Sequence, residues 1–172
     1  MRVVYRPMRP DERGFVISSW LLSYRKSMSA GIVPMDRWWE IMEPVVARYL
    51  ARSRVIVAAD PTETTRTADL FGHVVYETPP GRLPFVWYVY VKHDYRRNGL
   101  ARGLLRTAGI TVDTPIHYGC RTPVLTRLHE AGKLPRAEWR PLLGRVTQEE
   151  THGQGQGQDD DDRDEERARP GS

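Results

Sequence analysis

The stretch "LPFVWYVYV", residues 83–91, constrains the fold of this chain more than any other feature. It is apolar at consecutive positions, so a strand formed here presents apolar side chains on both of its faces. Side chains alternate between the two faces of a strand, so one face is predicted to carry Phe85, Trp87, Val89 and Val91. The opposite face is predicted to carry Val86, Tyr88 and Tyr90. A strand of this kind is central in its sheet and covered on both sides.

The segments before this strand supply a sheet and two helices. A short strand is predicted at 3–6, and further strands at 54–60 and 70–77, the latter forming an antiparallel hairpin with 83–91 around "TPPG". Asp11 is expected to cap a helix that runs to about residue 24, with Ile17, Leu21 and Tyr24 at helical spacing.

The second helix is expected to start at Asp36. Its apolar stripe is predicted to consist of Trp38, Ile41, Val45 and Tyr49. Pro44 lies inside it and predicts either a kink or a break into two short helices.

The segments after the central strand predict a parallel crossover. A helix is expected at 99–108, a strand near 114–119, a last helix near 122–131 that ends at Gly132, and a short edge strand within 137–146. The fold class is therefore α+β: a mixed, mostly antiparallel sheet flanked by helices, with a shortened C-terminal end.

Composition divides the chain into a domain at 1–148 and a tail at 149–172. The tail has Gly/Gln alternation followed by an acidic run, and it is predicted to be disordered. Residues 159–172 contain seven acids and three arginines, a net charge of −4, whereas the whole chain carries +4. The remaining +8 favours anionic partners in general, from phosphates to nucleic acid.

Cysteine usage and hydropathy point to a reducing, aqueous compartment. Cys120 is the one cysteine, which excludes an internal disulfide. No apolar run approaches the ~20 residues of a membrane span, and the first residues resemble no secretory signal. The expectation is a cytoplasmic protein without a membrane partner; the sequence does not determine its oligomeric state.

The stretch "RRNGLA", residues 96–101, lies between the central strand and the following helix. A helix start exposes backbone N–H groups and a partial positive charge, both of which favour an anion. Arg96, Arg97 and Asn98 directly precede this start, and Gly99 lets a ligand approach the backbone. The alternative is an ordinary glycine-containing helix start with solvated arginines.

This stretch resembles the acyl-CoA loop of the GNAT (Gcn5-related N-acetyltransferase) superfamily, whose pattern is Arg/Gln-x-x-Gly-x-Gly/Ala. The flanks "VYVKHDY" and "ARGLL" and the order of elements over 1–143 are similar too. The resemblance implies that acetyl-CoA binds as co-substrate, with no metal. It implies that the pantetheine arm pairs with the backbone of Val89, Tyr90 and Val91. The diphosphate would be held by Arg96, Arg97, Asn98, Gly99, Leu100 and Ala101.

The resemblance implies direct transfer of an acetyl group to a primary amine, but the usual catalytic residues are not all present. The strand before the loop contains no acid that would serve as the family's base. Glu77, His73, or a water held by Tyr88 or Tyr90 are the substitutes.

The family's proton donor is commonly a tyrosine on the last helix. In this chain "LHEAGK" places His129 at or near that position, and Tyr118 is a second candidate. Each of these residues has an ordinary structural alternative, either as a core side chain or as a solvated one.

Two other functions stay open at this level. One is a phage-type member of the superfamily that modifies nucleic acid, and the second is a binding module that has lost catalysis. Trp38, Trp39 and Met42 lie where the resembled family shapes its acceptor site. His117 and Cys120 have no second pair at zinc spacing, so a metal site is not expected.

Overall fold

The computed structural model describes residues 2–27, 33–62, 69–122, 129–130, 132 and 136–140. The predicted last helix lies mostly outside these residues, and the predicted tail lies wholly outside them. Within them, no helix is both long and apolar enough to cross a bilayer.

Six strands form one mixed sheet in the order β1-β2-β3-β4-β5-β6. The strands are β1 (Val4–Pro7), β2 (Arg54–Ala59), β3 (Leu70–Glu77), β4 (Phe85–Val91), β5 (Ile116–Tyr118) and β6 (Ala137–Trp139). The pairs from β1 to β4 are antiparallel, and β5 is parallel to both β4 and β6. The predicted mixed, mostly antiparallel sheet, its hairpin and its parallel crossover are confirmed.

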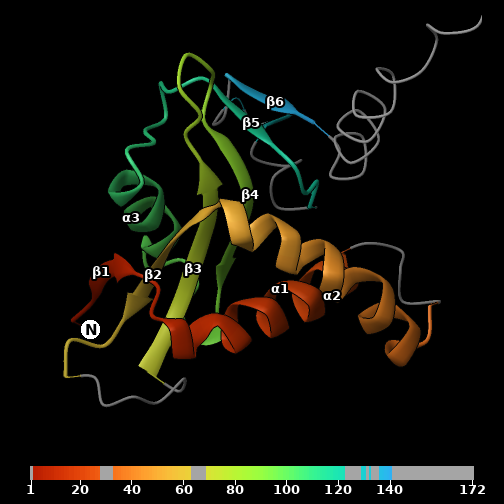
Figure 1. Cartoon of the computed structure of the whole chain (residues 1–172). Helices are drawn as coiled ribbons and strands as arrows, with labels where there is room; N and C mark the ends of the chain where they lie inside the picture. Colours follow the sequence, from red (N-terminus) through yellow and green to blue (C-terminus); the bar gives the residue numbers. More distant parts are fainter. Residues whose placement is uncertain are drawn as a thin grey trace, which may run out of the picture. The chain divides into compact units, whose positions relative to one another are not determined.

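Helices cover both faces of this sheet (Figure 1). The long helices α1 (Arg13–Ser27) and α2 (Met35–Arg52) lie on one face, and α3 (Leu100–Thr107) lies on the other. Two short 3-10 helices, η1 (Pro10–Glu12) and η4 (His93–Tyr95), precede α1 and α3. The expectation that the central strand is covered on both sides is confirmed.

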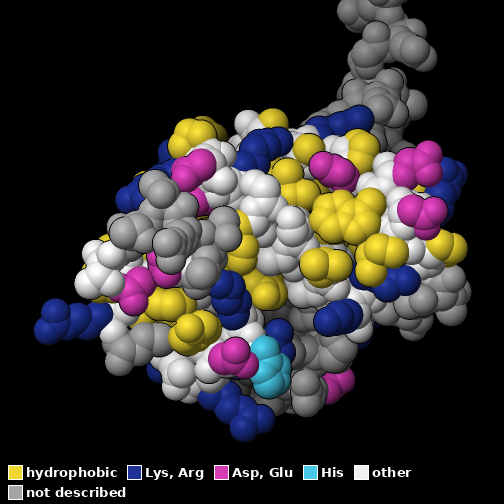
Figure 2. All heavy atoms as spheres, turned by 90° about the horizontal axis from the view of Figure 1, so that it is seen from below, with side chains coloured by type: hydrophobic (Ala, Val, Ile, Leu, Met, Phe, Trp, Pro, Cys, Tyr) yellow, Lys and Arg dark blue, Asp and Glu magenta, His cyan; other side chains and the backbone are white. Residues whose placement is uncertain are grey.

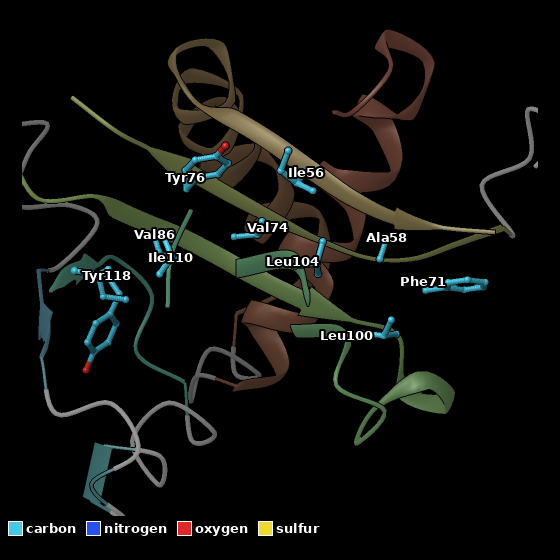
Figure 3. Close-up of a cluster of buried hydrophobic side chains, with 11 residues drawn as sticks. Ile56, Ala58, Phe71, Val74, Tyr76, Val86, Leu100, Leu104, Ile110 and Tyr118 are labelled. Carbon is cyan, nitrogen blue, oxygen red and sulfur yellow. The ribbon is translucent and has the colours of Figure 1, made fainter. Parts of the chain in front are cut away.

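The core on the α3 face is an apolar cluster in which Leu100 and Leu104 of α3 pack against β2, β3, β4 and β5 (Figure 3). Leu104 is completely buried, and Leu100 is 2% exposed. At ~25 cal/mol per Å² of apolar surface, burying each such side chain contributes about 2 kcal/mol. This packing fixes the start of α3 against the sheet.

Three details of the helices differ from prediction. Asp11 does not cap α1, because it lies inside η1, and Asp36 lies within the first turn of α2, whose N-cap is Pro34. Of the two alternatives predicted for Pro44, the break is excluded, because α2 runs without interruption from Met35 to Arg52, and the kink stays a prediction. Ile41 is 49% exposed, so the predicted stripe of α2 is wrong there.

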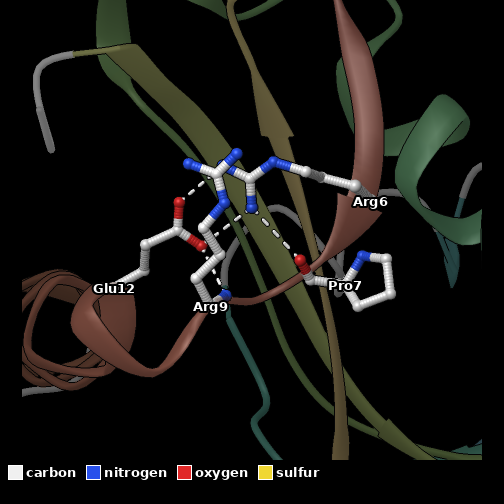
Figure 4. Close-up of polar contacts among 4 residues, drawn as sticks. All are labelled: Arg6, Pro7, Arg9 and Glu12. Carbon is white, nitrogen blue, oxygen red and sulfur yellow. Dashed lines mark hydrogen bonds and ion pairs between the residues drawn. The ribbon is translucent and has the colours of Figure 1, made fainter. Parts of the chain in front are cut away.

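An ion pair joins β1 to the start of α1 (Figure 4). The Arg6 guanidinium donates two hydrogen bonds to the Glu12 carboxylate, at 3.0 and 2.6 Å, and the backbone N–H of Arg9 donates a third at 2.7 Å. Glu12 is 4% exposed. Burial by itself would raise the pKa of Glu12, but the hydrogen bonds from Arg6 and Arg9 and their charges outweigh it and lower the pKa.

Glu12→Gln should therefore destabilise the protein in a pH-dependent way. At neutral pH we expect a loss of about 2 kcal/mol, because hydrogen bonds to a charged group contribute ~1.5–3 kcal/mol. A lowered carboxyl pKa stabilises the fold above the ordinary value of 4.5, and this stabilisation disappears as pH falls through the lowered value. Urea unfolding of both proteins from pH 7 down to pH ~3 measures the difference.

Glu40→Gln is the matched control, since its ion pair with Arg37 is exposed on both sides and should contribute less than ~1 kcal/mol. A difference between wild type and Glu12→Gln that does not shrink in acid would contradict the electrostatic explanation.

Candidate functional site

A β-bulge interrupts β4 at Trp87. Val75 is paired with Tyr88 and Tyr76 with Val86, which leaves Trp87 without a partner on β3. A bulge bends its strand and shifts the alternation of side chains. Trp87 and Tyr88 therefore both contact residues of the α1–α2 layer, whereas Val86 and Val89 pack in the α3-face cluster. The predicted strict alternation along this strand is wrong for this reason.

The bulge is held by contacts around the Trp87 indole. Its N–H donates to Glu77 at 2.6 Å, and its ring packs against Phe85 and Tyr49, with ring centroids 4.1 and 4.0 Å away. Arg52 donates to the same Glu77 oxygen at 3.1 Å and lies over the indole at 5.4 Å. Glu77 thus joins β3, α2 and the bulge, and its predicted role as a base stays a prediction.

The outer edge of β4 is open beyond the bulge. Strand β5 pairs with β4 only at Phe85 and Val86, and the last contact of that ladder is the 3.0 Å bond from the Gly119 N–H to the Val86 carbonyl. From Trp87 to Val91, no described residue pairs with this edge as a strand.

The phase of the β3–β4 ladder shows which backbone groups face the open side. The Lys92 N–H bonds to the Phe71 carbonyl at 2.8 Å, so Tyr90 and Tyr88 also direct their N–H and C=O groups to β3. Val89 and Val91 direct theirs to the open edge. The Arg96 Nε, which donates to the Val91 carbonyl at 3.1 Å from outside the sheet, agrees with this phase.

The start of α3 follows at the end of this edge. The first intrahelical bond is from the Gly103 N–H to the Gly99 carbonyl, so the N–H groups of the three residues between have no acceptor within the helix. No side chain caps the helix start. Gly99 has φ 75°, and Arg97 has φ 67°, a left-handed value that is uncommon outside glycine. Left-handed residues next to a helix start form concave arrangements of N–H groups that bind anions.

Charge reinforces this arrangement. Residues 92–107 contain five Lys and Arg side chains and one acid, Asp94. The side chains of Arg96 and Arg97 are exposed, and so are Asn98 and Gly99. Figure 2 shows the molecule from below relative to Figure 1, and basic side chains are spread over the visible surface with a few acidic ones between them. An anion bound at this loop meets a positive field.

The proposed catalytic residues do not gather at one place. Tyr118 is buried among the apolar side chains of the α3 face (Figure 3), and His129 is exposed. Tyr90 is half-buried on the opposite face, 5.5 Å from the ring of His73. Burial raises the pKa of Tyr90, and the Arg96 charge opposes this.

His73 is completely buried on the α1–α2 face. Neither of its ring nitrogens has a hydrogen-bond partner among the described residues. Burial lowers the pKa of His73 to about 3, so the imidazole is neutral at physiological pH and a weak base. It also lies one strand away from the open edge of β4, on β3.

Sequence reasoning missed a group of side chains at the point where β4 and β5 separate. Ser23 of α1 hydrogen-bonds to the Tyr88 hydroxyl at 2.8 Å, and Tyr24 lies next to Tyr88 with ring centroids 6.2 Å apart. The Cys120 thiol, two residues after β5, is buried nearby, and burial raises its pKa far above the ordinary value. The described residues contain no group of three or more potential metal ligands.

Gly99→Asp tests whether the start of α3 binds an anion. Asp and Asn both tolerate the left-handed conformation, and a side chain at Gly99 meets open space. We expect Gly99→Asp to weaken acetyl-CoA binding more than ~10-fold. The Asp carboxylate and the negatively charged pyrophosphate of the ligand would lie in contact and repel each other, at an effective dielectric constant of ~20. Gly99→Asn, with the same shape and no charge, should bind within a few-fold of wild type. Calorimetry measures both, and equal affinities would argue against an anion at this loop.

Glu77→Ala tests the support of the bulge. This substitution removes the carboxylate oxygen that accepts hydrogen bonds from the Trp87 N–H and the Arg52 guanidinium. We expect the free energy of unfolding, measured with urea, to fall by about 1–3 kcal/mol. Glu138→Ala removes an exposed carboxylate and is the control, with an expected change below ~1 kcal/mol. A pH–rate profile that loses its acid limb in Glu77→Gln would instead identify Glu77 as the base.

Comparison with known proteins gives structural likeness alone. No protein-family model matches the chain, and no curated protein matches it. Among solved structures it is similar to an acetyltransferase of the GNAT family from Staphylococcus aureus Mu50, at 14% identity and TM-score 0.43 over 62% of each chain.

Two further solved structures are similar at the same level. The IAA acetyltransferase of Bacillus cereus matches at 18% identity and TM-score 0.40, over 63% of this chain and 56% of that one. The PaiA N-acetyltransferase of Thermoplasma acidophilum, in complex with coenzyme A, matches at 16% identity and TM-score 0.43, over 63% of this chain and 70% of that one. The chain thus spans less than two thirds of the length of the Staphylococcus aureus and Bacillus cereus proteins. All three TM-scores are below 0.5, so these similarities do not establish a function. All three of these solved structures are acetyltransferases.

Proposed function

We propose that this protein is an acetyl-CoA-dependent N-acetyltransferase that moves an acetyl group directly to a primary amine. The observation that carries the proposal is that the unpaired edge of β4 is followed in the chain by the uncapped start of α3. A ligand with an anionic end and an extended arm that contains amides fits this arrangement. Coenzyme A thioesters have both.

The residues fit this ligand at each point. The N–H groups at the start of α3 would hold the pyrophosphate, with Arg96 and Arg97 supplying charge. The N–H and C=O groups of Val89 and the N–H of Val91 would pair with the amides of the pantetheine arm, as an added strand does. Gly99 keeps the approach to the backbone free, since no heavy atom lies within 4 Å of where its Cβ would be.

The arm would end near the bulge, where the reaction takes place. Acetyl-CoA supplies an acyl group activated as a thioester. The C–N bond forms as the C–S bond breaks, the amine nitrogen loses one proton and the sulfur gains one. Negative charge develops on the carbonyl oxygen and on the sulfur, so hydrogen-bond donors at this place accelerate the transfer.

Release of free thiol from acetyl-CoA, measured with a panel of amines, tests the proposal. The panel should contain polyamines, aromatic amines, lysine peptides and duplex DNA, and transfer of labelled acetyl to the product confirms acylation. We expect at least one amine to raise thiol release above the enzyme-free rate, and Gly99→Asp to abolish the increase at low acetyl-CoA concentration.

Thiol release that no acceptor increases, from protein that binds acetyl-CoA, would mean that the chain is a binding module. Acetylation of DNA alone would identify the acceptor as nucleic acid, and binding to the duplex should then weaken steeply with salt.

A further inference from the structure

Tyr24 of α1 lies over the point where β4 and β5 separate. Its ring is close to Tyr88, the residue of β4 that comes directly after the bulge, at a centroid distance of 6.2 Å and an interplanar angle of 75°. Tyr24 also interacts with Cys120, in the segment that leaves β5, since each of the two groups affects the pKa of the other. One side chain therefore contacts both sides of the opening, at the end opposite the anion-binding loop.

The neighbours of Tyr24 are fixed by packing. Trp20 stacks on Tyr88 at 5.2 Å with an interplanar angle of 9°, and Ser23 hydrogen-bonds to the Tyr88 hydroxyl at 2.8 Å. Trp20, Tyr88 and Cys120 are buried, with exposed fractions of 0, 6 and 1%. Tyr24 and Ser23 are only partly buried, and the Ser23 hydroxyl is already bonded to Tyr88, so Tyr24 is the aromatic side chain of this group that a ligand at the opening can reach.

The Tyr24 hydroxyl is a permanent hydrogen-bond donor. Burial, together with the neighbouring Cys120, raises the pKa of Tyr24 to about 12. The phenol therefore stays protonated throughout the physiological range and can donate to an anion without ionising.

We propose that Tyr24 is a catalytic residue whose hydroxyl donates a hydrogen bond to the sulfur of the coenzyme A thioester as the C–S bond breaks. This inference rests on the proposed function. A ligand arm paired with Val91 and Val89 and continuing toward Val86 would reach the opening beside Tyr88, where the Tyr24 ring lies.

Tyr24 stabilises the departing thiolate, and the proton lost by the amine reaches the sulfur through water. The phenol is unchanged after each turnover. A preorganised donor of this kind contributes ~10²–10³-fold to turnover when it faces developing charge.

The acidity of the bound coenzyme A thiol tests the inference without any amine. The protein is saturated with free coenzyme A and titrated while the ultraviolet absorbance of the thiolate is followed, with desulfo-coenzyme A as the blank. We expect the bound thiol of wild type to titrate about one to two pH units below that of free coenzyme A, since a hydrogen bond to a charged acceptor has this effect.

Tyr24→Phe should return the thiol to within about half a unit of its value in free coenzyme A, and should lower kcat without changing the KM for acetyl-CoA. Tyr76→Phe is the matched control, because Tyr76 is a buried tyrosine on the opposite face of the sheet (Figure 3). It should behave like wild type. Cys120→Ala removes the thiol next to Tyr24 but keeps the Tyr24 hydroxyl, so the bound coenzyme A thiol should stay acidic.

The outcomes separate this inference from the proposed function. A bound thiol with the same acidity in wild type and Tyr24→Phe would overturn the role of Tyr24, even if amines are acetylated. A lowered value in wild type that is lost in Tyr24→Phe would support it, even if none of the amines is a substrate. No calorimetric binding of coenzyme A to wild type would overturn both.

Discussion

The one-residue bulge at Trp87 determines the rest of the site. The ladder between β4 and β5 stops at the residue directly before the bulge. The ladder thus ends at Val86, and the groups at Val89 and Val91 are left facing outward. The carboxylate of Glu77 and the aromatic ring of Tyr49 hold the indole in place, so the opening is built into the packed structure rather than formed by a loop.

Sequence pattern predicted the fold because the hydrophobic periods here are long and clear. Strands β2, β3 and β4 and helix α3 lie within two residues of their predicted bounds. The errors have local causes. A bulge inserts one residue into a run that is apolar at every position, so no periodicity marks it. The pattern predicts Asp11 as the cap of α1. In the structure Asp11 lies inside η1, and the carboxylate of Glu12, the last residue of η1, accepts a hydrogen bond from the backbone N–H of Arg9.

The two parts of the candidate site differ in how far a sequence can predict them. The anion-binding part is contiguous, so its residues are adjacent in the chain and a short pattern is enough. The reacting part joins α1, β4 and the end of β5, which are 32 to 96 positions apart when Tyr24, Tyr88 and Cys120 are compared. Tyr24 is consistent with the apolar stripe of a helix, and only the contacts across the sheet distinguish it from a core residue.

An unpaired strand edge inside a sheet is unusual, because exposed N–H and C=O groups bind other chains. Edge strands at the border of a sheet are protected by charge or by covering loops. Here the sheet continues beyond the unpaired part of β4 through β5 and β6, and an extended partner would satisfy the exposed backbone groups of β4. The basic loop lies at one end of this edge, and the Tyr24 ring lies beside Tyr88 at the other. A coenzyme A thioester, the occupant proposed above, would therefore be oriented, with its anionic end at Arg97 and its reactive end at Tyr88.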